Sequence, residues 1–238
     1  MTRVLWPVIS SEAKRSREIS YCCKNVGAAS APRLSGHSGP SHLKEMRVFL
    51  LGFAVFVAFT IAKSSAGGIG TEVVVSVPDQ RLAIVERGRI VSSYSISTSK
   101  FGVGDAAGSY RTPLGTLFVS GKFGDGLRLG TVIKNRISTG EIVDANAPGR
   151  DAIVSRVIWL RGMEQQNRGA HDRCIYIHGT PEERRIGRPA SFGCIRMRSK
   201  DVIALYDAMH IGIHVTISQK RMNDLVPPEE PSLLARTD

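Results

Sequence analysis

Residues 71–86 read TEVVVSVPDQRLAIVE, and this stretch decides the fold class. Apolar and polar residues alternate through Val73, Val75 and Val77, a Pro-Asp pair follows at 78–79, and apolar residues then resume. A period of two matches the alternation of side chains across a strand, and proline with aspartate favours a turn. The stretch therefore predicts a strand, a turn and a second strand.

Similar patterns recur along the chain. Short apolar runs bounded by Gly, Asp and Pro predict further strands at 90–98, 116–120, 131–134, 153–160, 174–178 and 213–217. One segment has helical spacing instead: it begins near Ser199, where Ser-Lys-Asp suits a first turn, and Gly212 ends it. Its apolar stripe consists of Val202, Ile203, Leu205, Tyr206 and Met209. The sequence thus predicts a mostly β domain with one main helix over residues 71–218.

The N-terminal part contains an export signal. Residues 48–62 form an uncharged apolar run, preceded by Lys44 and Arg47 and followed by small residues up to Ala66. The run is shorter than the roughly 20 residues of a spanning helix, and the small residues match a cleavage site. We expect a signal peptide at 46–66, cleaved after Ala66, or an uncleaved N-terminal anchor, since a tilted or thinned bilayer accepts short runs. Both place the body of the chain in the periplasm or outside the cell.

The two ends of the chain are expected to lack a fold. Residues 1–45 have no periodicity and run into Met46, which suits a natural start, so they are a disordered leader or a spurious extension. Residues 219–238 become Pro-rich and charged from Asp224, and we expect a disordered tail there.

The net charge of +11 is unevenly distributed. Residues 1–66 hold nine Lys/Arg and three Asp/Glu, which leaves 23 and 18 of the totals of 32 and 21, or +5, for residues 67–238. That body has no Lys/Arg run with interleaved aromatics, so we expect no nucleic-acid partner. A mildly basic surface suits an anionic wall polymer.

Two motifs contain the candidate catalytic residues. Residues 174–180 read CIYIHGT, a predicted strand that ends near His178, with Tyr176 and His178 on one side and the isoleucines on the other. Cys194 follows 16 residues after His178, within SFGCIRM at 191–197. Gly193 lets the backbone turn sharply before the cysteine and direct its amide groups at one point.

These residue types suit nucleophilic catalysis. An ordinary thiol is mostly protonated at neutral pH, and an imidazole that accepts its proton raises the population of thiolate. We therefore expect Cys194 to be the nucleophile and His178 its general base. The N–H groups of Gly193 and Cys194 are placed to donate to the oxyanion of a tetrahedral intermediate, a contribution of about 3 kcal/mol per donor.

Other interpretations of the same residues stay open. A cysteine is often a small buried apolar residue, and a histidine at a strand end is often structural. Zinc-ligand residue types gather here, but their spacing matches no Cys-x-x-Cys or His-x-x-x-His pattern, so we expect neither a metal nor another cofactor; the residues are His171, Asp172, Cys174, His178 and Cys194. An extended strand puts Cys174 about 13 Å from His178, so Cys194 would lie beside only one of them. Cys174 is then a packed core thiol and not a disulfide partner.

The sequence resembles the L,D-transpeptidase catalytic domain. That family has a His followed by Gly or Ser and, some fifteen residues later, Ser-His-Gly-Cys-x-Arg/Asn; the matching residues here are His178-Gly179-Thr180 and SFGCIR at 191–196. The stretch RTPLG at 111–115 is similar to the family's Thr-Pro-x-Gly turn, and 212–217 to its closing strand. The resemblance extends over most of residues 71–218.

The resemblance implies a β-rich, sandwich-like fold and a cysteine acyltransferase. The cysteine would attack the carbonyl of the third residue of a peptidoglycan stem peptide, a diamino acid, and expel the terminal D-Ala. The thioester would then pass to a second stem, which gives a 3→3 cross-link, or to a wall-anchored lipoprotein, and carbapenems would acylate the same thiol.

The resemblance also implies roles for individual residues. Gly179 would hold His178 through its carbonyl, while Gly193 and Cys194 would supply oxyanion donors. Ser191, Thr180 and Arg196 fall at substrate-binding positions, and Arg196 is expected equally to brace the loop or to bind a substrate carboxylate.

One residue departs from the family pattern, because Phe192 stands where the family usually has His. The departure leaves the rate and the choice of substrate open. It also raises the alternative of a catalytically silent wall-binding module. A separate alternative is an L,D-carboxypeptidase or amidase, because water can replace the amine acceptor at the same thioester.

Overall fold

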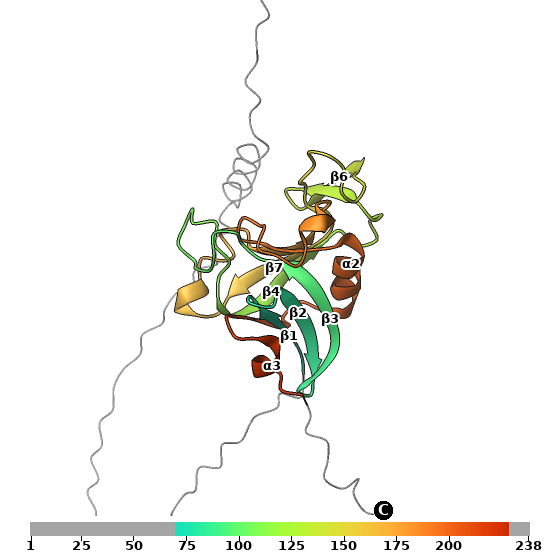
Figure 1. The fold of residues 1–238 in the computed structure, drawn as a ribbon. Coiled ribbons are helices and arrows are strands. Elements are labelled where there is room, and N and C mark those ends of the chain that lie inside the picture. The colour runs from blue at the N-terminus through green and yellow to red at the C-terminus, as the bar shows by residue number, and fades with distance from the viewer. Residues whose placement is uncertain (1–69, 229–238) are drawn as a thin grey trace, which may run out of the picture. The chain divides into compact units, whose positions relative to one another are not determined.

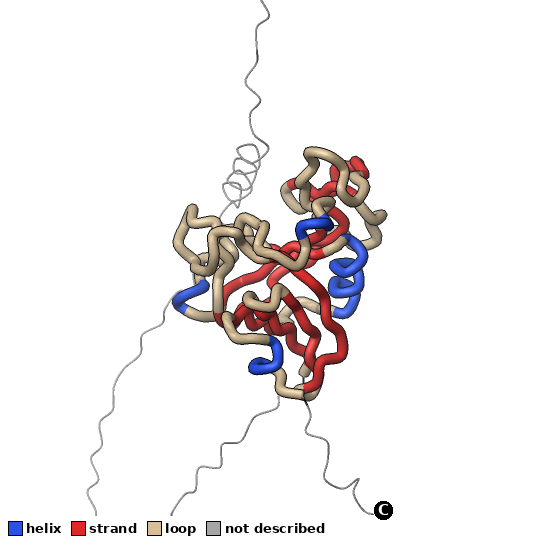
Figure 2. The backbone as a smooth tube through the Cα atoms, in the orientation of Figure 1, coloured by secondary structure: helices blue, strands red, loops and turns tan. Residues whose placement is uncertain are grey.

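The structure, a computed structural model, describes residues 70–228. The expected leader at 1–45, the expected signal peptide at 46–66 and residues 229–238 of the expected tail lie outside the described residues. The strands are β1 (Thr71–Ser76), β2 (Arg81–Glu86), β3 (Arg89–Ser97), β4 (Gly115–Phe123), β5 (Thr131–Lys134), β6 (Ile137–Ile142), β7 (Val154–Gly162), β8 (Tyr176–Gly179), β9 (Ile195–Met197) and β10 (His214–Ser218). The helices are α2 (Ser199–Ala208) and α3 (Met222–Leu225), with 3-10 turns η1 (Gln165–Asn167) and η2 (Glu183–Arg185). The domain is mostly β with one main helix, as predicted (Figures 1 and 2).

The strands form one sheet that closes on itself. Their order is β4-β10-β1-β2-β3-β9-β8-β7-β5-β6, and β4 also pairs with β7. The β5–β6 hairpin extends from β7, beyond the closed part. The sandwich-like arrangement expected from the sequence is thus realised as a single closed, barrel-like sheet. Within residues 70–228, none of the helices has the length and apolarity needed to cross a membrane.

The alternation that opens the domain fixes which side chains are buried. Val73 and Val75 are fully buried in the main core, while Val74 packs into a separate cluster. Alternate positions of the other strands join the same main core, among them Leu82, Ile96, Leu117, Ile158, Ile177, Ile195 and Val215. The predicted helix α2 completes this core with Val202, Leu205, Tyr206 and Met209.

Helix α2 begins at Ser199, as predicted, but its N-terminus is capped from outside the helix. The N-cap residue Arg198 makes no side-chain cap, and the Ser199 N–H donates to Oε1 of Glu183 at 2.9 Å. A carboxylate at a helix N-terminus satisfies a free donor and interacts favourably with the helix dipole. The loop after β8 is thereby tied to α2.

Three elements were not predicted. All residues of β6 are exposed, so its sequence shows no alternation, and β9 is only three residues long. Residues 219–228 are ordered and do not form the expected disordered tail: Met222 and Val226, at the ends of α3, are buried against Val74. The Met222 N–H donates to the Asp79 carboxylate at 2.6 Å, which anchors α3 to the β1–β2 turn. The long-range contact explains why the local composition was misleading.

Candidate active site

His178 is almost fully buried near the end of β8. Its Nδ1 lies 2.8 Å from the carbonyl oxygen of Gly179. Because a carbonyl oxygen can only accept, the neutral ring has its proton on Nδ1 and its lone pair on Nε2. The contact that the resemblance assigned to Gly179 is therefore present, and it sets the tautomer that a base at Nε2 requires.

Only glycine fits at position 179. A Cβ there would lie 2.5 Å from the carbonyl oxygen of Val154 on β7. Val154 is the registered partner of Gly179, so the two strands approach closely at this point. The close approach fixes the carbonyl that orients the imidazole.

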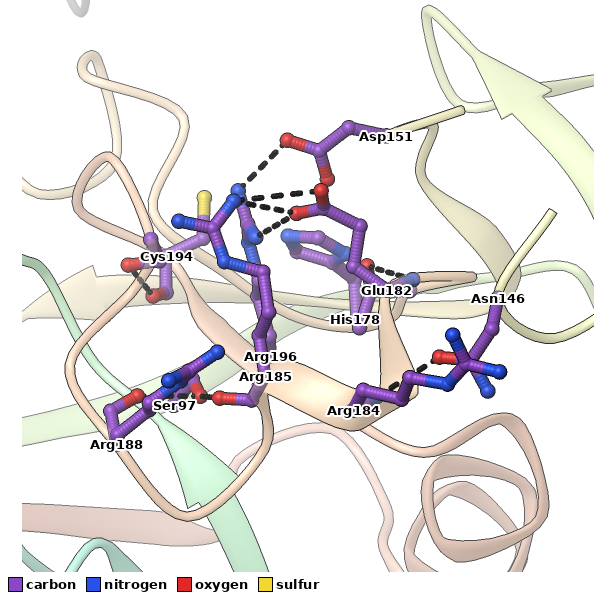
Figure 3. Close-up of polar contacts among 12 residues, drawn as sticks. Ser97, Asn146, Asp151, His178, Glu182, Arg184, Arg185, Arg188, Cys194 and Arg196 are labelled. Carbon is purple, nitrogen blue, oxygen red and sulfur yellow. Dashed lines mark hydrogen bonds and ion pairs between the residues drawn. The ribbon is translucent and has the colours of Figure 1, made fainter. Parts of the chain in front are cut away.

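The register of β8 and β9 places Cys194 on the same face as His178. Ile177 pairs with Ile195 and His178 with Arg196, and the two isoleucines belong to the main core. Cys194 and Arg196 alternate with Ile195, so they point to the opposite face together with His178. Figure 3 shows these three side chains rising from the same side of the strands. Cys194 thus comes two residues before the registered partner of His178, at the start of the neighbouring strand and on the same face.

The thiol of Cys194 also contacts the backbone of the second cysteine. Its Sγ donates to the carbonyl oxygen of Cys174 at 3.4 Å, and both cysteines are reduced and buried. Cys174 has a left-handed φ of 54°, so the chain turns there before β8 begins. The expectation that Cys194 would lie beside only one of Cys174 and His178 assumed a straight strand from 174 to 178, and this turn replaces that geometry. Cys174 itself packs into a buried cluster with Trp159 and Tyr176.

Hydrogen bonds within the protein hold the loop that precedes Cys194. Gly193 has a φ of 117°, which supports the expected sharp turn. The Ser191 hydroxyl donates to the Cys194 carbonyl and accepts the Gly193 N–H at 3.2 Å, and Thr112 Oγ1 donates to the Gly193 carbonyl at 3.0 Å. Ser191 is fully buried and shapes the loop through these bonds, and its substrate-binding role stays a prediction. The Gly193 N–H donates to Ser191 in this structure, and its oxyanion role also stays a prediction.

Arg196 is a buried brace. Its side chain is 1% exposed, and its terminal nitrogens donate to Asp151 and to Glu182, each at 2.9 Å (Figure 3). Both ends of the guanidinium are thus paired with protein carboxylates, which favours the bracing role over substrate binding. Asp151 precedes β7 and Glu182 follows β8, so Arg196 ties two loops to the strand beside His178. Sequence analysis missed both carboxylates, since neither belongs to a local motif.

Thr180 is held inside the protein. It is fully buried, and its Oγ1 accepts the N–H of Glu182 at 3.1 Å. Its own N–H donates to the carbonyl of Met197 on β9. Thr180 thus sets the turn that presents Glu182 to Arg196, and its substrate-binding role stays a prediction.

Phe192 joins an aromatic group beside the cysteine loop. Its ring lies 5.6 Å from Phe101 and 5.9 Å from Tyr110, and the ammonium of Lys100 lies 4.6 Å from its centroid. The Phe101 ring is partly exposed, at 44%. The position where the family usually has histidine thus contributes packing here. Among residues 70–228, no group of three His, Cys, Asp or Glu side chains is arranged to hold a metal ion.

Comparison with known proteins identifies the family to which the chain belongs. The model of the L,D-transpeptidase catalytic domain (YkuD) matches residues 70–217. Two proteins of Bacillus subtilis (strain 168), whose names place them provisionally among the L,D-transpeptidases, are also similar. YqjB is 32% identical over 72 residues, 30% of this chain and 41% of its own, and YkuD is 34% identical over 92 residues, 35% of this chain and 51% of its own. The chain thus spans about half the length of these relatives.

Solved structures of L,D-transpeptidases are similar to the chain at low identity. The enzyme from Xylanimonas cellulosilytica DSM 15894 is 22% identical, with a TM-score of 0.40 over 63% of this chain and 60% of that chain. The enzyme from Mycobacterium smegmatis is 16% identical, with a TM-score of 0.41 over 63% of this chain and 59% of that chain.

Proposed function

We infer the activity of this chain from its family, because the chain belongs to the L,D-transpeptidase catalytic-domain family. We propose that it is a cysteine acyltransferase that acts on the stem peptides of peptidoglycan, with Cys194 as nucleophile and His178 as general base. One observation carries the proposal: the Gly179 carbonyl holds Nδ1 of His178 and leaves Nε2 as the basic atom on the face that Cys194 shares.

In the first half of the reaction, the Cys194 thiol loses its proton to Nε2 of His178. The thiolate attacks the carbonyl carbon of the diamino acid at stem position three, and a tetrahedral oxyanion forms. The Cys194 N–H is a candidate for the donor to that oxyanion. The carbon–nitrogen bond then breaks, His178 returns the proton to the departing amine, and D-Ala leaves while a thioester stays on Cys194.

In the second half, an amine attacks the thioester. His178 takes a proton from the attacking amine and returns it to the sulfur as the carbon–sulfur bond breaks. An amine of a second stem peptide gives a 3→3 cross-link, and an amine of a lipoprotein gives a wall-anchored protein. Water in place of the amine gives a tripeptide, the product of an L,D-carboxypeptidase.

The proposal is tested with purified wall sacculi and a carbapenem. We expect a carbapenem adduct in the intact mass of the wild type, none in Cys194→Ala, and new 3→3 dimers only with the wild type. His178→Gln should lower turnover about 100-fold or more, the usual contribution of a general base. Cys174→Ala is the matched control, because it removes the second buried thiol and keeps the carbonyl that Cys194 contacts.

The products decide between the candidate reactions. Turnover retained by Cys194→Ala would refute the nucleophile. Tripeptides without dimers would indicate hydrolysis, and released protein would indicate an amidase. The absence of both adduct and products in the wild type would leave a wall-binding module in which Phe192 has replaced a needed histidine.

We also propose that the chain acts outside the cytoplasm, in the periplasm or secreted. The support is the apolar run at 48–62 with basic residues before it and small residues after it. Fractionation of cells that express the full chain, with the mass of the mature protein, tests the proposal. A protein that stays in the cytoplasmic fraction with residues 46–66 attached would refute it.

A further inference from the structure

Two aromatic side chains, Tyr176 and Trp159, lie on the two strands beyond Cys194 in the sheet. Trp159 of β7 is the registered partner of Tyr176 of β8, so both side chains point to the same face. Their rings make an edge-to-face contact with centroids 5.9 Å apart. Tyr176 alternates with Ile177 and so shares the face of His178, and both aromatic residues belong to one buried cluster with Cys194. Tyr176 therefore lies between Cys194 and Trp159 across the sheet.

The indole ring of Trp159 lies between two nitrogen-bearing side chains. The His171 imidazole stacks on it, with centroids 3.8 Å apart and planes 11° apart. The guanidinium carbon of Arg136 lies 4.7 Å from the Trp159 centroid. Because His171 covers one face of the indole, Arg136 lies over the other. Arg136 also donates to the Tyr176 hydroxyl at 3.3 Å, which fixes the direction of its guanidinium.

Arg161 lies on the far side of His171. Its Nη2 lies 3.3 Å from Nε2 of His171, whose Nδ1 is 3.4 Å from the carboxylate of Asp172, an almost fully exposed side chain. Burial and then the charge of Arg161 lower the pKa of His171, so the ring is neutral at neutral pH and its Nε2 accepts from Arg161. Two guanidinium groups thus stand at the two ends of an aromatic stack that is itself uncharged.

We propose that the row Arg136–Trp159–His171–Arg161 is a subsite in which Arg161 binds a free carboxylate of the donor stem peptide. The inference rests on the proposed function and adds to it the charge and the place of a recognised substrate group. A guanidinium binds a carboxylate through two parallel hydrogen bonds, and an aromatic face keeps the guanidinium plane oriented. The exposed Arg161 supplies the group that a peptide reaches from solvent, and Arg136 adds positive charge on the other side of the stacked rings.

The distance fits a group on the same peptide as the attacked carbonyl. Neighbouring strands are about 4.8 Å apart, so the backbone of Trp159, two strands from β9, is about 10 Å from Cys194. An extended peptide spans about 3.3–3.6 Å per residue. A carboxylate held level with Trp159 therefore belongs within about three residues of the attacked carbonyl, and one at the Arg161 guanidinium lies further along the peptide.

The subsite is tested by binding, so that the result does not depend on turnover. Isothermal titration of the Cys194→Ala chain would use two synthetic stem peptides that differ only in free or amidated carboxylates. We expect amidation to weaken binding about fivefold, the effect of a partly exposed charge pair. Arg161→Gln should weaken the free-carboxylate peptide by a similar factor and leave the amidated peptide unchanged, and Arg136→Gln should have a smaller effect. The control Arg87→Gln, an exposed arginine in the β2–β3 turn, should change neither affinity.

Three results would overturn the subsite: equal affinity for the two peptides, an equal loss for both peptides in Arg161→Gln, or no binding of either peptide. Failure of the proposed function is seen separately. In that case the wild type binds the free-carboxylate peptide selectively, yet the intact mass shows no acylation of Cys194.

Discussion

Replacement of Arg196 by Gln separates its two proposed roles. The variant removes a guanidinium that is 1% exposed and leaves Asp151 and Glu182, whose side chains are 19% and 26% exposed, without it. If Arg196 is a brace, the fold should lose stability and the KM for a stem peptide should stay unchanged. If it binds substrate, the KM should rise and the stability should stay unchanged.

The expected loss follows from the contacts. Removal of one partner of a buried ion pair costs about 3–5 kcal/mol. The lower end applies here, because both carboxylates reach solvent and Glu182 keeps a second partner, Arg185, at 3.2 Å. A loss of about 3 kcal/mol corresponds to a Tm about 6–12 °C lower in a domain of this size.

Urea unfolding at 25 °C and thermal melts measure this loss. Arg198→Gln is the matched control, because Arg198 lies two residues further on and its pair with Asp201 is exposed, at 3.7 Å. Its effect should stay within about 0.5 kcal/mol. A loss below about 1 kcal/mol in Arg196→Gln, with a clearly raised KM, would refute the brace.

Three further predictions follow from single contacts. Gly179→Ala should cost about 1–3 kcal/mol in urea unfolding, because its Cβ would lie 2.5 Å from the Val154 carbonyl, and an unchanged midpoint would contradict this close approach. Asp79→Ala should speed hydrogen exchange across 222–226, because it removes the carboxylate that accepts the Met222 N–H, and unchanged exchange would show that α3 is held otherwise. The same hydrogen bond holds the pKa of Asp79 below its ordinary value, so its stabilising contribution is present above about pH 3.8 and is lost as the pH falls further. Burial and the charge of Arg161 lower the pKa of His171, so the unfolded chain binds the proton more readily and the free energy of unfolding should fall as the pH drops below about 6.5. His171→Asn should lose this part of the pH dependence. Identical slopes of unfolding free energy against pH in the variant and the wild type would refute the prediction.

The sequence alone identified the elements whose signals are local. The alternation in residues 71–86 predicted β1 and β2, and the apolar stripe after Ser199 predicted α2, because each pattern reflects the period of its own backbone. Two short motifs with a turn-forming glycine also singled out His178 and Cys194, and the register of β8 and β9 places both on one face. Strand β6 was not predictable, because all its residues are exposed and show no alternation.

Tertiary structure decided what the remaining motif residues do. Ser191, Thr180 and Gly193 lie in the right motifs, yet their polar groups are used inside the protein, a fact that only the folded loops reveal. Arg196 became a brace because the fold brings Asp151, 45 residues away, and Glu182 to its two ends. A buried charge must find partners wherever the chain places them, and such partners leave no mark in local sequence. The residues of a motif can thus be recognised from the sequence, while the atoms that they contact depend on segments far away in the chain.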